Sequence, residues 1–211
     1  MSGFVAYLSW PEAAIYIPWD IWIVTWIAAA LWANRTVKTP GIGREIAYRI
    51  LTLLGFVLLL FVQGQTSGDF LKGLHTQQPL LQRYWALPRN VGWVMVGLVS
   101  LGCLFAWWAR IHLGRLWSGR ITRKEGHKVV DTGPYAIVRH PIYTGLILAA
   151  FATAAEKGTP LAVIGALLFY VGYWMKARLE ERFLREELGP KDYDAYRARV
   201  PMLIPFGPRS F

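Results

Sequence analysis

The stretch that decides our interpretation runs from Gly133 to Gly145 and reads GPYAIVRHPIYTG. It places Arg139, His140 and Pro141 side by side immediately before an apolar segment. Proline fits the first turn of a helix, where a missing N–H removes no intrahelical bond. The free N–H groups of that turn and the helix dipole favour an anion. Taken alone, the triplet favours the simpler interpretation, a membrane helix whose arginine reaches lipid headgroups.

The composition points to a membrane protein. Of the 211 residues, 55% are hydrophobic and only 17% are charged, and 11 are tryptophan. Such a chain has more apolar surface than one small soluble core can hide, so we expect a bilayer as its solvent. The net charge is +10, but the basic residues lie between apolar segments. This placement favours anionic lipid headgroups over nucleic acid as partners.

Five apolar segments predict an all-α integral membrane protein with about five transmembrane helices. They cover residues 15–33, 46–62, 91–109, 141–155 and 160–175. The last two are short for a full crossing, so we expect a tight helical hairpin packed against protein. Between the second and third segments, the polar stretch 63–90 has room for a short interfacial helix. We divide the chain into an N-terminal half, residues 1–109, with three spans, and a catalytic half, residues 110–211.

The basic residues also predict an orientation. Lys and Arg number none in residues 1–33, four in 34–49, three in 63–90, seven in 110–140, one in 155–160 and eight from 176 onward. Alternate connections are therefore basic, and the positive-inside rule assigns them to the cytoplasm. This predicts an N-terminus outside and a C-terminus inside, with the Arg139 motif on the cytoplasmic face.

The C-terminal segment has the pattern of an amphipathic helix. Apolar residues recur at 179, 183, 184 and 188, and Gly189 with Pro190 should end the helix. A short second helix is then expected to follow. The pattern fits either a helix lying on the membrane or a cytoplasmic lid over a ligand pocket. The acidic pair Glu180 and Glu181 favours the lid.

A longer motif combines these features. The pattern H-x-V-V-x-x-G-x-Y-x-x-x-R-H-P-x-Y-x-G begins at His127, and E-E-x-x-L follows the apolar hairpin at Glu180. Together they resemble the isoprenylcysteine carboxyl methyltransferase family over residues 113–205. The resemblance implies an integral membrane enzyme, here of a bacterial inner membrane, with its active site facing the cytoplasm. It implies S-adenosyl-L-methionine as cofactor and a lipophilic methyl acceptor, with O-methylation of an isoprenylcysteine-type carboxylate as the reaction.

The resemblance also implies the site residues. The cofactor shell falls on His127, Lys128, Val129, Val130, Tyr135, His140, Pro141, Ile142, Tyr143 and Glu180. We add Arg139, because with His140 at the helix start it can take the carboxylate of the cofactor. On the acceptor side, the family carries an arginine one helical turn before the glutamate, where this chain has Lys176. Lysine lacks the planar fork that holds a carboxylate with two bonds. We therefore take Lys176, Arg178 and Glu181 together as the catalytic candidates.

Other functions stay open at this point. The short R-H-P-x-Y pattern is also similar to membrane sterol reductases that use NADPH. Within methyltransferases, the acceptor could equally be a phospholipid amine or a small thiol. A non-catalytic membrane scaffold is a further alternative. The sequence contains no strand followed by a Gly-rich turn and an acidic residue, so it does not support a doubly wound nucleotide-binding fold. No set of Cys and His residues has the spacing of a metal site, so we predict no metal.

Overall fold

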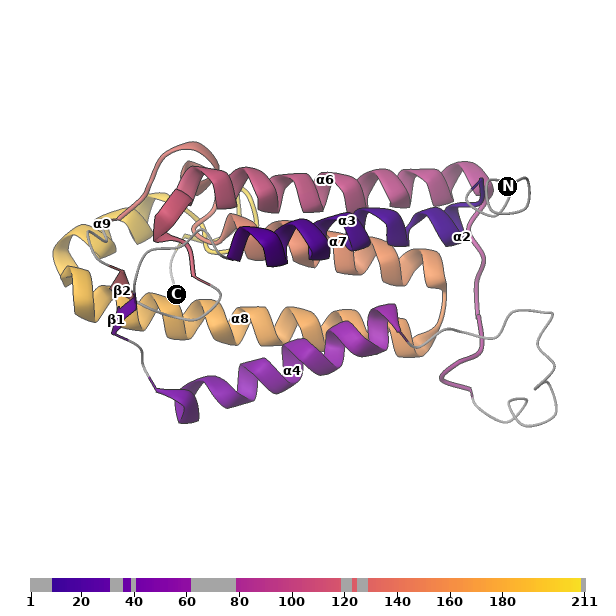
Figure 1. Ribbon diagram of the computed structural model, residues 1–211, viewed down its shortest axis with the longest axis horizontal. Helices are drawn as coiled ribbons and strands as arrows, with labels where there is room; N and C mark the ends of the chain where they lie inside the picture. The colour runs from indigo at the N-terminus through magenta and orange to yellow at the C-terminus, as the bar shows by residue number, and fades with distance from the viewer. Residues whose placement is uncertain are drawn as a thin grey trace.

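The computed structural model describes residues 9–30, 36–38, 41–61, 79–118, 123–124 and 129–209, which form an elongated helical bundle (Figure 1). The α-helices are α2 (Pro11–Ala14), α3 (Tyr16–Ala30), α4 (Ile42–Leu60), α6 (Arg89–Leu113), α7 (Pro141–Lys157), α8 (Pro160–Leu188) and α9 (Pro190–Arg199). The other elements are the 3-10 helices η1 (Gly114–Leu116) and η2 (Gly133–Ala136) and an antiparallel pair, β1 (Thr36–Lys38) with β2 (Arg123–Lys124). Apart from this two-stranded ribbon, the expected all-helical class is confirmed.

Three helical stretches are long and apolar enough to cross a bilayer. Judged by length and composition they are Pro11–Ala30, Arg89–Leu113 and Pro160–Glu187. The helices α4 and α7 form in the other two predicted segments, but they are not among these three. Helices at all five apolar segments are thus confirmed, whereas five complete crossings remain a prediction. The stretch 63–90 is described only from residue 79, and residues 79–88 contain no helix.

Helix α8 joins two stretches that the sequence described one after the other. The expected apolar span over residues 160–175 and the amphipathic helical pattern that follows it form one continuous helix of 29 residues. No glycine or proline lies between Gly172 and Gly189, so nothing interrupts the backbone hydrogen bonds. Gly189, with φ 99°, then ends α8, and Pro190 begins α9, as predicted. The long helix carries the acidic pair rigidly out of the apolar bundle.

The turn between α7 and α8 confirms the expected tight hairpin. Gly158 adopts a left-handed conformation, φ 64°, and its N–H donates to the carbonyl of Ala154 at 3.1 Å. The Thr159 hydroxyl then accepts from the N–H of Ala162, and Pro160 occupies the first turn of α8. A glycine at the end of one helix and a proline at the start of the next is the arrangement that such a turn requires.

Glycines allow two pairs of helices to pack closely. A Cβ atom on Gly102 of α6 would lie 2.3 Å from the carbonyl oxygen of Gly145 in α7. A Cβ atom on Gly55 of α4 would lie 2.6 Å from the carbonyl oxygen of Gly165 in α8. Small residues at helix contacts are typical of membrane bundles, where close van der Waals packing replaces the hydrophobic effect. These contacts set α6 against α7 and α4 against α8 (Figure 1).

One end of the bundle collects the polar connections. At this end α3 and α8 finish, α4 and α7 begin, α6 finishes, and α9 and the C-terminal segment lie close by (Figure 1). We call it the α9 end. The three most basic stretches of the sequence begin or end here, so they lie on the same side of the bundle, as the alternating charge counts predicted.

Candidate functional site

At the α9 end, residues 133–141 form a turn that we call the motif turn. Its shape depends on one glycine and two prolines. Gly133 has φ 57°, and a Cβ atom there would lie 2.7 Å from the ring of His112. Pro134 begins η2, and Pro141 begins α7. His140 is the residue immediately before α7, with φ −126° and ψ 64°. These restraints hold the motif in one compact turn at the start of α7.

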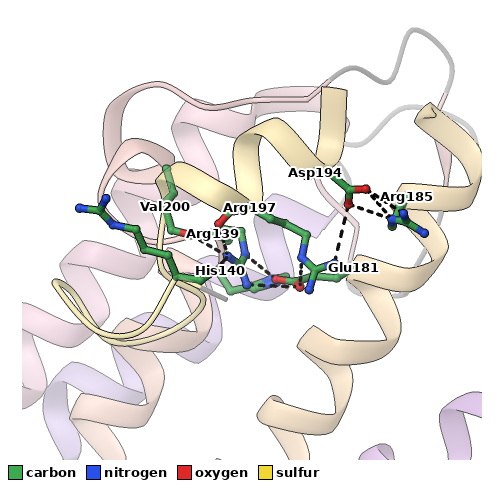
Figure 2. A network of polar contacts seen from close by, with 8 residues as sticks. Arg139, His140, Glu181, Arg185, Asp194, Arg197 and Val200 are labelled. Carbon is green, nitrogen blue, oxygen red and sulfur yellow. Dashed lines mark hydrogen bonds and ion pairs between the residues drawn. The ribbon is translucent and has the colours of Figure 1, made fainter. Parts of the chain in front are cut away.

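Arg139 braces this turn against the C-terminal segment. Its side chain is 1% exposed, and its Nε donates to Oε1 of Glu181 at 2.6 Å. Its Nη1 donates to the carbonyls of Val200 at 2.6 Å, Arg197 at 3.1 Å and Arg209 at 3.1 Å (Figure 2). The three carbonyls come from the end of α9 and the segment after it. We call Arg139, Glu181 and these carbonyls the Arg139 brace.

Glu181 is shared among three basic side chains. Besides Arg139, its carboxylate lies 3.1 Å from Nε2 of His140 and 3.4 Å from Nε of Arg197 (Figure 2). The side chain is only 4% exposed, so its charge is balanced by these neighbours and not by water. A buried carboxylate of this kind is tolerated because charge-assisted hydrogen bonds replace its hydration. Glu181 therefore ties α8 to the motif turn and to α9.

A cavity of about 210 Å³ lies beside the brace. From the predicted cofactor shell it is lined by Val129, Val130, Tyr135, Arg139, His140, Pro141, Ile142 and Tyr143. Helix α8 contributes Lys176 and Glu180 to its wall. Residues that are far apart in the sequence, on the motif turn and on α8, thus meet around one space.

Glu180 forms the polar centre of this cavity. The hydroxyl of Tyr143 donates to its Oε2 at 2.6 Å, and Nδ1 of His140 lies 3.8 Å from the same oxygen. The rings of His140 and Tyr143 stack at 5.2 Å with an angle of 5° between their planes. Glu180 is 27% exposed, unlike its neighbour in the sequence. It can therefore still accept hydrogen bonds from a ligand in the cavity.

Lys176 lies one helical turn before Glu180 and faces the same cavity. Its Nζ lies 5.1 Å from the ring centroid of Tyr143, 5.9 Å from that of Tyr48 and 6.0 Å from that of Tyr173. An ammonium over aromatic faces at such distances is held by cation–π attraction. The arrangement puts a cation at the wall of a largely aromatic pocket, where it can attract an anion.

The remaining predicted residues lie elsewhere. Arg178 does not line the cavity, and its guanidinium lies 5.7 Å from the ring of Trp174. Glu181 does not line it either and belongs to the Arg139 brace. His127 and Lys128 fall outside the described residues.

Several aromatic residues of the cavity wall were not predicted as site residues. Trp22 and Trp26 of α3 line it, and their rings lie 4.8 Å apart. The four-residue spacing of Trp22 and Trp26 indicates a common helix face. Tyr173 of α8 also lines the cavity, and its three-residue spacing from Lys176 is a comparable signal. Nothing in the sequence showed that α3 would reach the motif turn.

Helix α9 closes one side of the cavity with two tyrosines. Tyr193 and Tyr196 line it, and the hydroxyl of Tyr196 donates to the carbonyl of Tyr135 at 2.7 Å. Burial raises the pKa of the Tyr135, Tyr193 and Tyr196 phenols above the ordinary value. These hydroxyls therefore stay neutral at physiological pH, and Tyr196 remains a hydrogen-bond donor to the motif turn.

Comparison with known proteins identifies relatives of this chain. The sequence model of the isoprenylcysteine carboxyl methyltransferase family matches residues 95–186. The chain is 33% identical over 134 residues to protein-S-isoprenylcysteine O-methyltransferase B of Arabidopsis thaliana, covering 61% of this chain and 64% of the relative. It is 27% identical over 168 residues to protein-S-isoprenylcysteine O-methyltransferase of Schizosaccharomyces pombe, covering 77% and 68%. It is 32% identical over 138 residues to methanethiol S-methyltransferase 2 of Bradyrhizobium diazoefficiens, covering 61% and 52%.

The matched region coincides with the cavity. The chain spans slightly less than two thirds of the Arabidopsis relative. Residues 95–186 contain the motif turn, the α7–α8 hairpin and Glu180, which together form most of the polar wall. The family expected from the motifs is thereby confirmed, and the matched segment supplies most of the candidate site, to which α3 and α9 add their aromatic side chains.

Proposed function

Because the chain belongs to the isoprenylcysteine carboxyl methyltransferase family over residues 95–186, we propose that it transfers a methyl group from S-adenosylmethionine to a lipophilic acceptor. One observation carries this proposal. Tyr143 and Glu180, 37 residues apart, meet in a 2.6 Å hydrogen bond at the centre of a cavity that the family motif surrounds. Because this hydrogen bond joins the motif to α8 inside the cavity, we propose the cavity as the cofactor site.

The cavity residues suit the polar groups of S-adenosylmethionine. The first turn of α7, where Pro141 and Ile142 line the cavity, suits the cofactor's carboxylate because helix N-termini favour anions. Glu180 can accept hydrogen bonds from the ribose hydroxyls or the amine. The ring of Tyr143 offers a π-face to the sulfonium. Arg139 already donates to Glu181 and three carbonyls, so we assign it to holding the turn.

We propose that a wall of the cavity moves when the cofactor binds. The volume of about 210 Å³ lies below the roughly 300–1,000 Å³ of typical small-molecule pockets. Helix α9 is the wall we propose as the lid, because Tyr193 and Tyr196 line the cavity from it. Opening α9 would break the hydrogen bond from Tyr196 to Tyr135 and the contacts of Arg197 with Arg139 and Glu181, and closing would exclude water from the site.

The protein's part in the reaction is then mainly positioning. The cofactor supplies a methyl group that is already activated, so the chain has to align an acceptor with it. Trp22, Trp26 and Leu146 give the cavity an apolar wall that excludes water. A water-poor site favours the reaction of an anion with a sulfonium, because charge is neutralised as the methyl group moves.

The proposed acceptor is a carboxylate on a lipophilic molecule, attracted by Lys176. The relatives from Arabidopsis and Schizosaccharomyces carry the name of isoprenylcysteine O-methyltransferases. A small thiol is the second candidate, because another relative is named methanethiol S-methyltransferase 2. Lys176 is compatible with either a carboxylate or a thiolate acceptor. It supplies a positive charge but not the bidentate hydrogen bonds by which an arginine selects a carboxylate.

We propose further that the α9 end faces the cytoplasm of a bacterial inner membrane. The support is the excess of Lys and Arg in the three connections at this end. Reporter fusions test it: a fusion at Phe211 should report the cytoplasm, and one after Thr76 the opposite side. A fusion at Phe211 that reports the periplasm would contradict this orientation.

Calorimetry on the detergent-purified protein tests the cofactor. S-adenosylmethionine and S-adenosylhomocysteine should bind, and NADPH should not. Methyl transfer from labelled S-adenosylmethionine to a prenylated cysteine analogue, a lipid amine and a small thiol then compares the acceptors. Binding of NADPH alone would overturn the methyltransferase proposal and favour the reductase alternative.

A further inference from the structure

One face of α8 changes from aromatic to cationic along its length. Tyr170, Trp174, Arg178 and Arg182 follow at four-residue spacing, so they form a single stripe. Residues 160–175 carry no charge, which places Arg178 close to the boundary between lipid and water. At 1.5 Å per residue the stripe is about 18 Å long. It lies away from the face that carries Lys176 and Glu180 to the cofactor cavity.

The aromatic half of the stripe forms a groove with the C-terminal segment. The groove has a volume of about 470 Å³ and is lined by Tyr170 and Trp174 from α8 and by Met202, Leu203 and Ile204. Arg178 also lines it. Trp174 and Ile204 are exposed, so the groove presents apolar surface at the level where acyl chains meet headgroups.

The cationic half of the stripe borders a second hollow of about 760 Å³. Five arginines line it, Arg178, Arg182, Arg185, Arg197 and Arg209, against one glutamate and one aspartate. We call this hollow the arginine basin. Both acids already form ion pairs, because Glu181 pairs with Arg139 and Asp194 pairs with Arg185 (Figure 2). The basin therefore keeps an excess of positive charge.

Arg178 lines both the groove and the basin, so the two hollows adjoin at this side chain. An apolar groove next to a cationic basin at the membrane boundary matches an anionic phospholipid. The groove suits the acyl chain, and the basin suits the negatively charged phosphate. We propose that this face of α8 binds an anionic phospholipid of the surrounding bilayer, with the phosphate at Arg178 and Arg182 and an acyl chain over Trp174. No residue of the arginine basin lines the cofactor cavity, whereas the buried Arg139 lines both the groove and that cavity.

Native mass spectrometry of the detergent-purified protein tests this site. Phosphatidylglycerol should bind more tightly than phosphatidylcholine with the same chains. The double variant Arg178→Gln/Arg182→Gln should bind phosphatidylglycerol about tenfold or more weakly, since each basic residue near a membrane surface contributes roughly fivefold. The matched control is Arg44→Gln/Arg199→Gln, which removes the same charge from exposed positions outside both hollows.

Two further experiments test whether the site binds a whole lipid or only a free anion. Trp174→Ala should weaken phosphatidylglycerol binding, and inorganic phosphate at equal concentration should not displace the lipid. Thermal unfolding of each variant should match that of the control, because the substituted side chains lie at or near the surface. Equal binding of both lipids, equal losses in the double variant and the control, or displacement by phosphate alone would each overturn the proposal.

Discussion

Replacing Glu181 by glutamine should destabilise the fold before it affects any ligand. The substitution keeps the shape of the side chain but removes the charge that faces Arg139, His140 and Arg197. Arg139, 1% exposed, would then be a buried cation without a carboxylate. Breaking a buried ion pair by removing one partner costs about 3–5 kcal/mol.

We expect a value near the lower end of that range. Glutamine still offers one oxygen, and Arg139 keeps the carbonyls of Arg197, Val200 and Arg209 as acceptors. A loss of about 3 kcal/mol corresponds to a fall in Tm of roughly 6–12 °C for a chain of this size. Tryptophan fluorescence during heating of the detergent-solubilised protein would measure it. Glu186→Gln is the matched control, because Glu186 is exposed on the same helix.

A double variant sharpens the test. Arg139→Met combined with Glu181→Gln should lose less stability than the sum of the two single variants, because no buried charge remains unpaired. The reasoning would be refuted if Glu181→Gln melted like Glu186→Gln yet failed to bind S-adenosylhomocysteine. That result would return Glu181 to the ligand site, where the sequence interpretation had placed it.

Substitutions at three other positions give separate expectations. Glu180→Gln should weaken S-adenosylhomocysteine binding by about 1–3 kcal/mol in calorimetry with little change in Tm, since a hydrogen bond to a charged group is lost; unfolding with normal binding by the folded fraction would make Glu180 structural. Lys176→Ala should slow transfer to an anionic acceptor while cofactor affinity stays nearly intact, and Lys176→Arg should improve a prenylcysteine carboxylate; fast esterification unaffected by Lys176→Ala would contradict this role. Gly102→Ala should lower Tm, because overpacking costs about 1–3 kcal/mol or more and its Cβ would lie 2.3 Å from a carbonyl oxygen; Gly97→Ala, with nothing within 4 Å, is the control and should melt like wild type.

Much of the helical framework could be predicted from local signals. Apolar runs predicted the positions of the five long helices, and Pro141 and Gly189 predicted where α7 begins and α8 ends. These signals act within a few residues, so the sequence displays them directly. The apolar run predicted α8 up to residue 175, and the helical spacing at 179, 183, 184 and 188 predicted a helix beyond it, but neither signal showed that the two stretches form one helix. Charge ends the apolar surface, but it does not interrupt backbone hydrogen bonds, and only glycine or proline would have done so.

The partners of Arg139 could not be predicted. Three of them are backbone carbonyls 58, 61 and 70 residues further along the chain, and any residue type supplies a carbonyl. The family motif therefore marks Arg139 without revealing whether it contacts a ligand or the chain itself. The same holds for Trp22 and Trp26, whose place in the cavity depends on how α3 packs at the α9 end.

The adjacent glutamates show how one motif serves two purposes. Consecutive residues on a helix point about 100° apart, since the helix has 3.6 residues per turn. Glu180 is consequently directed to the cavity, where Tyr143 donates to it, while Glu181 is directed to the Arg139 brace. His140 contacts both, with Nδ1 3.8 Å from Glu180 and Nε2 3.1 Å from Glu181. A ligand that moves the His140 ring would therefore disturb the Arg139 brace, and we propose that the position of α9 and the occupancy of the cavity are coupled in part through this imidazole.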